Sequence, residues 1–520
     1  MSHTLCRRRT PPVRRWIVVV FALLAAGCKL DGDHETPSQS AGESLTRAVD
    51  SVRKAADSVR LVSNEVRGTG GPDLGSLYNR TARADDRDRN PIVVIPGILG
   101  SRLVDDRTGE VAWGEFGSSG PIPGTAASVQ ALGLPMAAGR PLSTLSDDVR
   151  EDGVLSELAV KAFGQSLHVS AYGDILKALG VGGYRDPNGH TGPVEYDDGT
   201  HNCFEFGYDW RRDNAENAAR LHAFLLEKRK LLEEQEIRKH GSLSHPVRFD
   251  IVAHSMGGLI ARYHLMYGPA QLPLEGTPPS ITWKGAELVE RLVIIGTPSA
   301  GAGSAVKQLA EGVQYAKFLP KYEPALLGTM PAVYQLLPRT RHQPVVDATT
   351  GAAVDLFDPA VWRKLKWGLA SPDQSRVLEQ LLPEVRDASV RQQLADEHLT
   401  KCLRQAELFH AALDEPATPP PGVTLHLIAG DAHPTLARFT VDAAGKLTVT
   451  EESPGDGTVT RSSALMDERL SQGSTWTPRL VSPVAWSSVN FLFTDHLGLT
   501  ADPAFTDNVL YLLLEAPRNR

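Results

Sequence analysis

The stretch from Arg248 to Arg262 constrains the fold of this chain more than any other. An apolar run ends abruptly at Ala253, and a helix-type pattern begins only a few residues later. Ser255 is thereby placed on a tight strand-to-helix turn, the setting of a nucleophile elbow, which needs small residues such as Ala253 and Gly257 on both sides of the serine. The sequence therefore predicts Ser255 as a nucleophile. The alternative is a serine that only caps the following helix.

Further apolar runs on either side of this turn have the length of buried strands. They begin at Pro91, Phe204, Arg291 and Val423, and helical patterns separate them. Strands that alternate with helices favour a mostly parallel central sheet with helices on both faces, so the predicted fold class is α/β. Residues 90–520 are enough for one such domain with insertions.

Two insertions are expected in this domain. The strand signal vanishes between residues 301 and 421, where an apolar and aromatic stretch precedes a long helical pattern from Glu384 to Leu413. This range is expected to form a cap over the site, and a lid is expected at about 101–170.

Residues 1–28 have the layout of a bacterial lipoprotein signal. Five arginines among the first fifteen residues precede an apolar run that ends at Ala26 and is too short to span a bilayer. Cys28 then resembles the lipidated cysteine of a lipobox, and diacylation there would anchor the mature chain stably. Lys29, by resemblance to such lipoproteins, points to the outer membrane of the cell envelope. The alternative is an ordinary signal peptide and a secreted protein.

Residues 29–89 are predicted to form a tether between this anchor and the globular domain. Apolar residues recur at steps of three and four through residues 43–67, which predicts one amphipathic helix. The helix would pack on the domain or on a second copy, or would lie on a membrane surface. Residues 68–89, rich in Gly and charge, have the composition of a linker.

The charge balance excludes nucleic acid as a partner. The chain has 54 Lys and Arg against 62 Asp and Glu, a formal net charge of −8, and so lacks a basic footprint. Outside the signal segment and Cys28, the cysteines are Cys203 and Cys402. These two either pair in an oxidising compartment or remain buried thiols, and neither has the spacing of a metal ligand. Neither a metal nor an organic cofactor is expected.

Seven short motifs follow one another between residues 91 and 515. They are Pro96-Gly-Ile-Leu-Gly, Gly207-Tyr-Asp-Trp-Arg, Ala253-His-Ser-Met-Gly-Gly, Gly296-Thr-Pro, Met330-Pro-Ala-Val-Tyr-Gln-Leu-Leu-Pro, Gly455-Asp-Gly-Thr-Val and Asp495-His-Leu-Gly-Leu. In this order they resemble the lecithin:cholesterol acyltransferase family, which includes related phospholipases and phospholipid:diacylglycerol acyltransferases. The resemblance implies an α/β-hydrolase fold with a lid and a cap, and activity on the acyl chains of phospholipids or similar lipids. The chain departs from the family in showing no disulfide-held lid between residues 101 and 198.

In an α/β-hydrolase the acid and then the histidine follow the nucleophile along the chain. His496 lies between an apolar run and a helix-like pattern, where a loop after the last strand can reach Ser255, and is the predicted base. Two acids compete for the orienting role: Asp431 directly follows a strand, and Asp456 lies in a Gly-Asp-Gly turn. Their spacing favours neither. The family resemblance favours Asp456, with Asp431 as the alternate.

The run that begins at Pro91 ends in a Pro-Gly turn, where such an enzyme needs backbone amides for the oxyanion. The family motif assigns one amide to Leu99, and the other is that of Met256, the residue after the nucleophile. The resemblance thus implies acyl transfer from a lipid ester through an acyl-enzyme on Ser255. An alcohol as acceptor gives O-acyl transfer, and water gives the hydrolysis of a phospholipase or lipase. A non-catalytic lipid-binding surface protein on a hydrolase scaffold is the remaining alternative.

Overall fold

The computed structural model describes residues 89–116, 125–155, 157–162, 165–170, 172–191, 201–314, 321–471 and 473–518. The predicted signal peptide, Cys28 and the predicted helix at 43–67 lie outside these residues. Within the described ranges, no helix is both long enough and apolar enough to cross a membrane.

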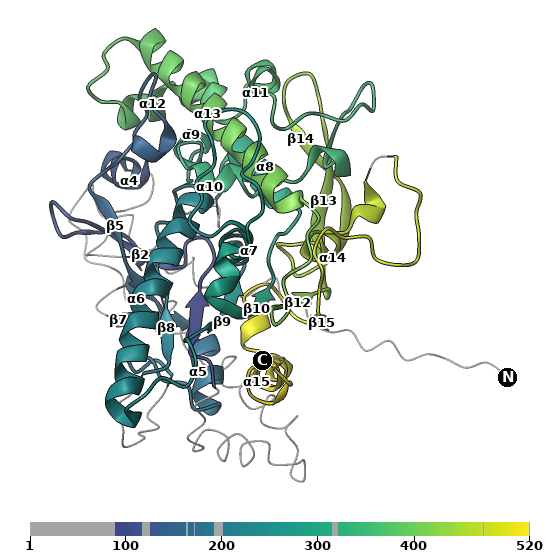
Figure 1. The fold of residues 1–520 in the computed structure, drawn as a ribbon. Helices are drawn as coiled ribbons and strands as arrows, with labels where there is room; N and C mark the ends of the chain where they lie inside the picture. Colours follow the sequence, from purple (N-terminus) through teal and green to yellow (C-terminus); the bar gives the residue numbers. More distant parts are fainter. Residues whose placement is uncertain are drawn as a thin grey trace, which may run out of the picture.

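A six-stranded sheet forms the centre of the domain, and all of its neighbouring strands pair in parallel (Figure 1). This confirms the predicted α/β class. In spatial order the strands are β15 (Ser488–Leu492), β12 (Thr424–Gly430), β10 (Val289–Ile295), β9 (Phe249–His254), β1 (Ile92–Ile95) and β8 (Cys203–Glu205).

Both faces of the sheet are covered, which explains why its central strands are buried along their whole length and mostly apolar. In β1, Val93 and Ile95 pack into one apolar cluster, while Ile92 and Val94 pack into a second. Residues of the long helices α6 and α7 belong to the first cluster, and residues of α5 and α15 belong to the second. The helices are α5 (Gly173–Val181), α6 (Asn214–His240), α7 (Met256–Tyr267) and α15 (Pro503–Leu510), the last followed by a π-helical turn (Tyr511–Glu515).

The chain between β10 and β12 is mainly helical and gathers beyond one end of the sheet, at the top of Figure 1. Its described α-helices are α8 (Gly303–Glu311), α9 (Pro324–Leu327), α10 (Pro331–Tyr334), α11 (Pro359–Leu365), α12 (Ser375–Leu381) and α13 (Ala388–Asp414). Asp387 caps the N-terminus of the long helix α13, and its carboxylate accepts from the amides of Ser389 and Val390. It packs against α7, α10 and α12.

One prediction for this range is wrong. The sequence predicts no strand between residues 301 and 421, but the structure has the three-residue strand β11 (Val345–Asp347). It pairs in parallel with β13 (His433–Val441), which lies far downstream in the chain. So short a strand depends on this distant pairing and leaves no periodic pattern of its own.

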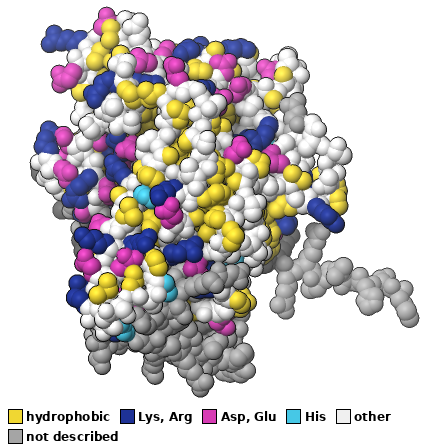
Figure 2. Space-filling view, in the orientation of Figure 1, with side chains coloured by type: hydrophobic (Ala, Val, Ile, Leu, Met, Phe, Trp, Pro, Cys, Tyr) yellow, Lys and Arg dark blue, Asp and Glu magenta, His cyan; other side chains and the backbone are white. Residues whose placement is uncertain are grey.

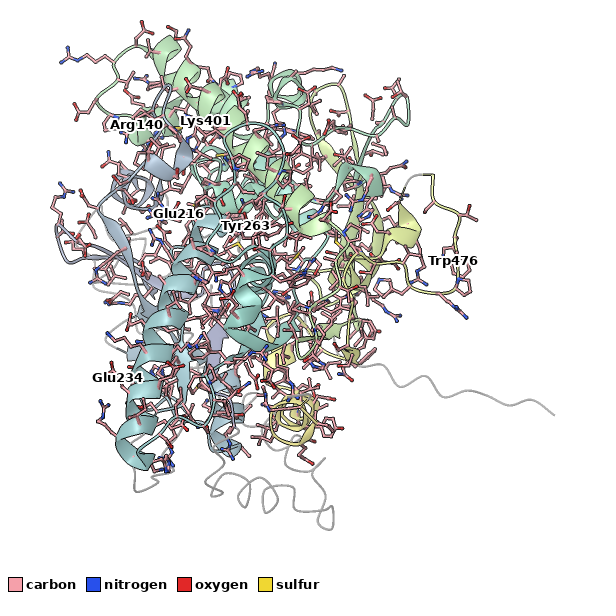
Figure 3. The ribbon with its side chains drawn as sticks, in the orientation of Figure 1. Arg140, Glu216, Glu234, Tyr263, Lys401 and Trp476 are labelled. Atoms are coloured by element: carbon pink, nitrogen blue, oxygen red, sulfur yellow. The ribbon has the colours of Figure 1, made fainter. Side chains whose placement is uncertain are left out.

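In the described part of the range predicted as a lid there are two small sheets, one α-helix and one short 3-10 helix (Leu142–Thr144). The first sheet consists of β2 (Ser101–Asp105), β3 (Val111–Trp113) and β5 (Val149–Val154), and the second of β4 (Glu115–Phe116), β6 (Glu157–Ala162) and β7 (Gln165–Ser170). The helix, α4 (Ala126–Leu132), packs against α12. Figure 3 shows Arg140 beside Lys401 of α13, and the Lys401 ammonium donates to the carbonyls of Ala137 and Arg140. The two insertions therefore contact each other; their functions as lid and cap stay predictions.

The outer surface carries both signs of charge. On the face shown in Figure 2, Lys and Arg side chains are interspersed with Asp and Glu, and hydrophobic side chains gather along the middle.

Candidate active site

Ser255 lies where β9 ends and α7 begins, with φ 53° and ψ −127°. A residue with a side chain rarely adopts these angles, so its surroundings must hold the turn. The Ser255 amide donates to the carbonyl of Ile295 (2.8 Å), and the Thr297 hydroxyl donates to the Ser255 carbonyl (2.7 Å). A Cβ on Gly257 would lie 2.4 Å from the carbonyl oxygen of Pro96. Because the chain after β1 passes so close, the position two residues after Ser255 must be a glycine.

His496 links Ser255 to a buried carboxylate. Its Nε2 lies 3.0 Å from the Ser255 Oγ, and its Nδ1 lies 2.7 Å from Oδ2 of Asp456. Because the carboxylate can only accept, Nδ1 carries the hydrogen and Nε2 is left to accept from the serine hydroxyl. The loop after β15 supplies the histidine, and the hairpin of β13 and β14 (Leu447–Gly455) leads to the acid. The fold thus brings together three residues that lie far apart in the sequence.

The surroundings of Asp456 keep its carboxyl ionised. The residue is 2% exposed, and its Oδ1 accepts from the amides of Thr458 (2.9 Å) and Val459 (2.7 Å). Burial alone would raise the pKa of Asp456, but its attraction to His496 and these hydrogen bonds hold that pKa below its ordinary value. The carboxylate can therefore orient the imidazole and stabilise it when it becomes positively charged.

Asp431, the alternate acid, takes no part in this arrangement in the described structure. It directly follows β12, and its amide donates to the carbonyl of Leu492 (3.4 Å). Among the described residues, the carboxylate bonded to His496 is that of Asp456 alone.

A second histidine, His254, forms a hydrogen bond with the backbone of His496. His254 is buried, and its Nε2 donates to the backbone carbonyl of His496 (3.1 Å), with the ring centroids 4.8 Å apart. Burial, reinforced by the nearby His496, lowers the pKa of His254 to about 3. A neutral imidazole at this position fixes the loop that carries His496 without adding charge.

The predicted oxyanion turn, residues 97–100, passes directly beside Ser255. A Cβ on Gly97 would lie 2.7 Å from the Cβ of Ser255 and 3.2 Å from its Oγ. The Gly100 amide donates to the Gly97 carbonyl (3.1 Å), and Leu99 has φ 66°. In the described part of the chain, the amides of Ile98 and Leu99 have no acceptor, whereas Gly97 donates to the hydroxyl of Tyr172 (2.9 Å). Met256 is the first residue of α7, where an amide has no partner within the helix.

Three buried aromatic side chains donate hydrogen bonds to backbone carbonyls of this turn and of the residues next to it. The Tyr208 hydroxyl donates to the Pro96 carbonyl (2.9 Å), and the Trp210 indole donates to the Ser101 carbonyl (3.2 Å). The Trp113 indole donates to the Leu99 carbonyl (2.9 Å). The sequence analysis uses Tyr208 and Trp210 only as part of a family motif and does not predict their hydrogen bonds to the turn. Buried aromatic residues that each carry one hydrogen-bond donor were the available signal.

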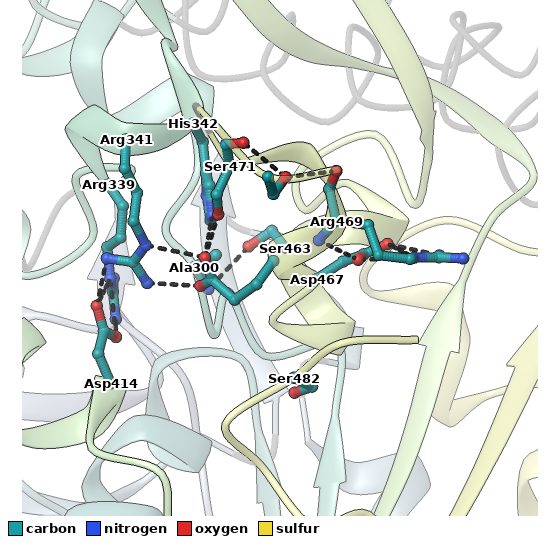
Figure 4. Close-up of polar contacts among 12 residues, drawn as sticks. Ala300, Arg339, Arg341, His342, Asp414, Ser463, Asp467, Arg469, Ser471 and Ser482 are labelled. Atoms are coloured by element: carbon teal, nitrogen blue, oxygen red, sulfur yellow. Dashed lines mark hydrogen bonds and ion pairs between the residues drawn. The ribbon is translucent and has the colours of Figure 1, made fainter. Parts of the chain in front are cut away.

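A set of ionic contacts, here called the ion cluster, joins residues 339–342 to Asp414 and Glu468 (Figure 4). Arg341 bonds to Asp414 (2.7 Å) and to Glu468 (2.5 Å), Arg339 bonds to Asp414 (2.9 Å), and His342 bonds to Glu468 (3.2 Å). The cluster thereby joins the end of α13 to the chain after α14 (Arg461–Leu465).

One group of described residues has the composition of a metal site. Ligand atoms of Asp186, His190 and Glu205 lie within 4.8 Å of one another. His190 is bonded to Glu205 (2.9 Å), and the Asp186 carboxylate accepts from the amide and hydroxyl of Thr191, so hydrogen bonds account for the cluster. Cys203 and Cys402, whose pairing the sequence leaves open, are both free and buried.

Comparison with protein families gives one match. The model of the family described as lecithin:cholesterol acyltransferase matches residues 194–452. This segment contains Ser255 and ends shortly before Asp456, so it includes neither Asp456 nor His496. None of the curated proteins matches the chain.

Several solved structures resemble the fold. A chain of the Tle4–Tli4 complex has 15% sequence identity and a TM-score of 0.50, and the match covers 82% of this chain and 98% of that one. The propeptide form of Bacillus licheniformis lipase BlEst2 has 12% identity and a TM-score of 0.32, with 84% and 53% covered. Phospholipase PlaB from Legionella pneumophila has 12% identity and a TM-score of 0.21, with 50% and 36% covered. At 15% identity the likeness to the chain of the Tle4–Tli4 complex concerns the fold alone.

Proposed function

Because the chain belongs to the lecithin:cholesterol acyltransferase family, we propose that it is a serine enzyme that moves a fatty acyl group from a phospholipid or similar lipid ester to an alcohol. The observation that carries this proposal is the continuous hydrogen-bonded series from Ser255 through His496 to Asp456, next to a fastened oxyanion turn. A phospholipase or lipase would use the same acyl-enzyme with water as the acceptor, and is the alternative.

In the first half of the proposed reaction, His496 Nε2 takes the proton of the Ser255 hydroxyl as Oγ attacks the ester carbonyl carbon. The carbonyl oxygen gains the negative charge and accepts hydrogen bonds from the amides of Leu99 and Met256. Asp456 holds Nδ1–H and stabilises the imidazolium. The imidazolium then gives its proton to the leaving lysolipid alcohol, and the acyl group stays on Ser255.

The second half repeats these steps with a new acceptor. His496 takes a proton from an alcohol or a water molecule, whose oxygen attacks the acyl-enzyme, and the proton returns to Ser255 Oγ. A lipid-binding protein without activity would not need Ser255 in a strained conformation beside an aligned base, so the geometry supports an enzyme.

The proposed place of action is the cell envelope. The lipobox-like Cys28 and the tether at residues 29–89 would hold the catalytic domain near membrane lipid, which is the proposed source of the acyl group. Residues 1–88 lie outside the described structure, so sequence carries this part of the proposal.

Product analysis tests the function directly. The full chain is incubated with phosphatidylcholine vesicles, with and without a sterol or a fatty alcohol, beside the Ser255→Ala variant. An ester of the added alcohol that is absent with the variant supports transfer, and free fatty acid alone replaces transfer by hydrolysis. A folded wild-type chain that gives no product and no serine labelling by a fluorophosphonate would overturn the enzyme proposal.

A further inference from the structure

We propose that Tyr172 is a positioning residue for the reaction at Ser255: its hydroxyl fixes the Gly97 amide and so holds the oxyanion turn against the nucleophile. This inference rests on the proposed function. Tyr172 directly precedes α5, outside every motif quoted for the family, and no step of the mechanism above uses it.

The position of the Tyr172 hydroxyl carries the proposal. It accepts from the Gly97 amide at 2.9 Å, in a fully buried contact between residues 75 positions apart. A Cβ built on Gly97 would lie 3.2 Å from this hydroxyl oxygen and 3.2 Å from the Oγ of Ser255. The phenol hydroxyl and the Ser255 hydroxyl therefore both lie on the side of the turn that a side chain at position 97 would occupy.

Because Gly97 donates to Tyr172, the amides of the turn that remain free among the described residues are those of Ile98 and Leu99. Gly100 donates to the Gly97 carbonyl, and the carbonyls of Pro96 and Leu99 are held by Tyr208 and Trp113. Without Tyr172, the buried Gly97 amide would have no acceptor in the described structure. An unpaired buried amide destabilises the turn, and a rotation of the Pro96–Gly97 peptide would relieve that cost. Such a rotation would displace the next two amides, which need placement to within a fraction of an ångström.

Tyr172 also contacts the histidine side of the site. Its ring meets that of His254 edge to face, with the centroids 5.6 Å apart, and His254 in turn donates to the His496 carbonyl. The Tyr172 ring is so close to Gly100 that a Cβ on that glycine would lie 2.6 Å from the ring. Burial raises the pKa of Tyr172 to about 12, so the phenol stays protonated and uncharged in neutral solution.

The Tyr172→Phe variant of the full chain tests the proposal, because it keeps the ring and removes the hydroxyl. We expect kcat for a soluble ester to fall about 10- to 100-fold. This fall does not exceed the one expected from removing an oxyanion donor. KM should change less than about twofold, and the rate of fluorophosphonate labelling should fall in parallel with kcat. Tyr184→Phe is the matched control: Tyr184 belongs to the same apolar cluster, but its hydroxyl has no partner in the described structure.

The outcomes separate this inference from the function on which it rests. A wild-type chain with neither product nor label overturns both. An active wild type with a Tyr172→Phe variant that keeps kcat within about twofold overturns the inference alone. If Tyr172→Phe lowers the melting temperature markedly, p-aminophenylalanine at position 172 supplies a lone pair for the Gly97 amide, and kcat must then recover most of its loss. Failure to recover in a folded protein also rejects the positioning role.

Discussion

The site at Ser255 and the ion cluster both join a histidine to a largely buried carboxylate, but they leave the histidine in different states. In the site, amides of Thr458 and Val459 bond the Asp456 carboxylate, and His496 keeps one ring nitrogen for the nucleophile. In the ion cluster, the guanidinium of Arg341 bridges both carboxylates, and the Nε2 of His342 is occupied by Glu468.

This difference indicates what makes a histidine available for proton transfer. Neutral backbone donors stabilise a carboxylate without a competing positive charge, so the carboxylate can still stabilise a positively charged imidazole. Permanent guanidinium charges fix the carboxylates of the ion cluster, and the hydrogen bond to Glu468 occupies the Nε2 of His342. The arrangement at Ser255 therefore suits proton transfer. The arrangement in the ion cluster suits the joining of two segments of the chain.

The largest expected effect comes from removing the nucleophile. Ser255→Ala should lower kcat by about 10⁵- to 10⁶-fold, because the acyl-enzyme cannot form. Ester hydrolysis or transfer and fluorophosphonate labelling measure this loss. Ser299→Ala is the control. Ser299 is buried and directly follows the Gly296-Thr-Pro motif, and its Oγ has no hydrogen-bond partner in the described structure. Equal loss in both variants would contradict a special role for Ser255.

The next effect distinguishes the two candidate acids. Asp456→Asn should lower kcat by about 10⁴-fold, because an amide no longer enforces the tautomer that leaves Nε2 free to accept. Asp431→Asn should change kcat less than about threefold, since Asp431 has no bond to His496 in the described structure. The reverse pattern would make Asp431 the orienting acid. Circular dichroism and melting temperature verify that both variants fold.

These acids also mark the boundary of what the sequence predicts. Ser255 and His496 carry local signals, a strand-to-helix turn and a loop after the last strand, and the parallel sheet follows from apolar runs. Which acid meets His496 depends on the path of the hairpin β13–β14, which brings Asp456 back to the sheet edge. Spacing along the chain contains no such information, and only resemblance favoured the acid that the structure places there.

Long-range hydrogen bonds set a similar limit on the oxyanion turn. Tyr172 and Trp113 reach the turn from segments 75 and 14 residues away, through one hydrogen bond each. Neither belongs to a periodic pattern that points to the turn. The short strand β11 was missed for the same reason, because its partner β13 lies in a separate part of the chain.

A smaller effect is expected at His254, which supports His496 through its backbone. His254→Phe keeps a ring but removes the donor to the His496 carbonyl, so kcat should fall about 3- to 30-fold, as for one misplaced group. The pKa of His254 is lowered to about 3, so this residue is already neutral throughout the working range. The acid limb of the kcat profile should therefore keep its position in the variant. A shift of that limb by one pH unit or more would show that His254 itself titrates during turnover.

The smallest effect on activity, and the clearest contrast with the site, is expected in the ion cluster. Burial would raise the pKa of Glu468, but hydrogen bonds from Arg341, His342 and Ser471 hold it well below its usual value. A carboxyl with a depressed folded-state pKa stabilises the fold above its unfolded pKa, about 4.3, and loses that stabilisation as pH falls toward the folded value. Glu468→Gln should therefore cost about 1–3 kcal/mol of unfolding free energy at pH 7, with kcat within about twofold.

The pH dependence tests this assignment in one experiment. Denaturant unfolding of the wild type and of Glu468→Gln should give curves that begin to converge as pH falls below about 4, because the carboxyl of the unfolded chain then takes up a proton while that of the folded chain is still ionised. Glu452→Gln, on the exposed part of β14, should match the wild type throughout. A stability difference that stays constant with pH would mean that Glu468 acts through packing and not through its charge. A large fall in kcat at unchanged stability would instead place the ion cluster within the chemistry of the site.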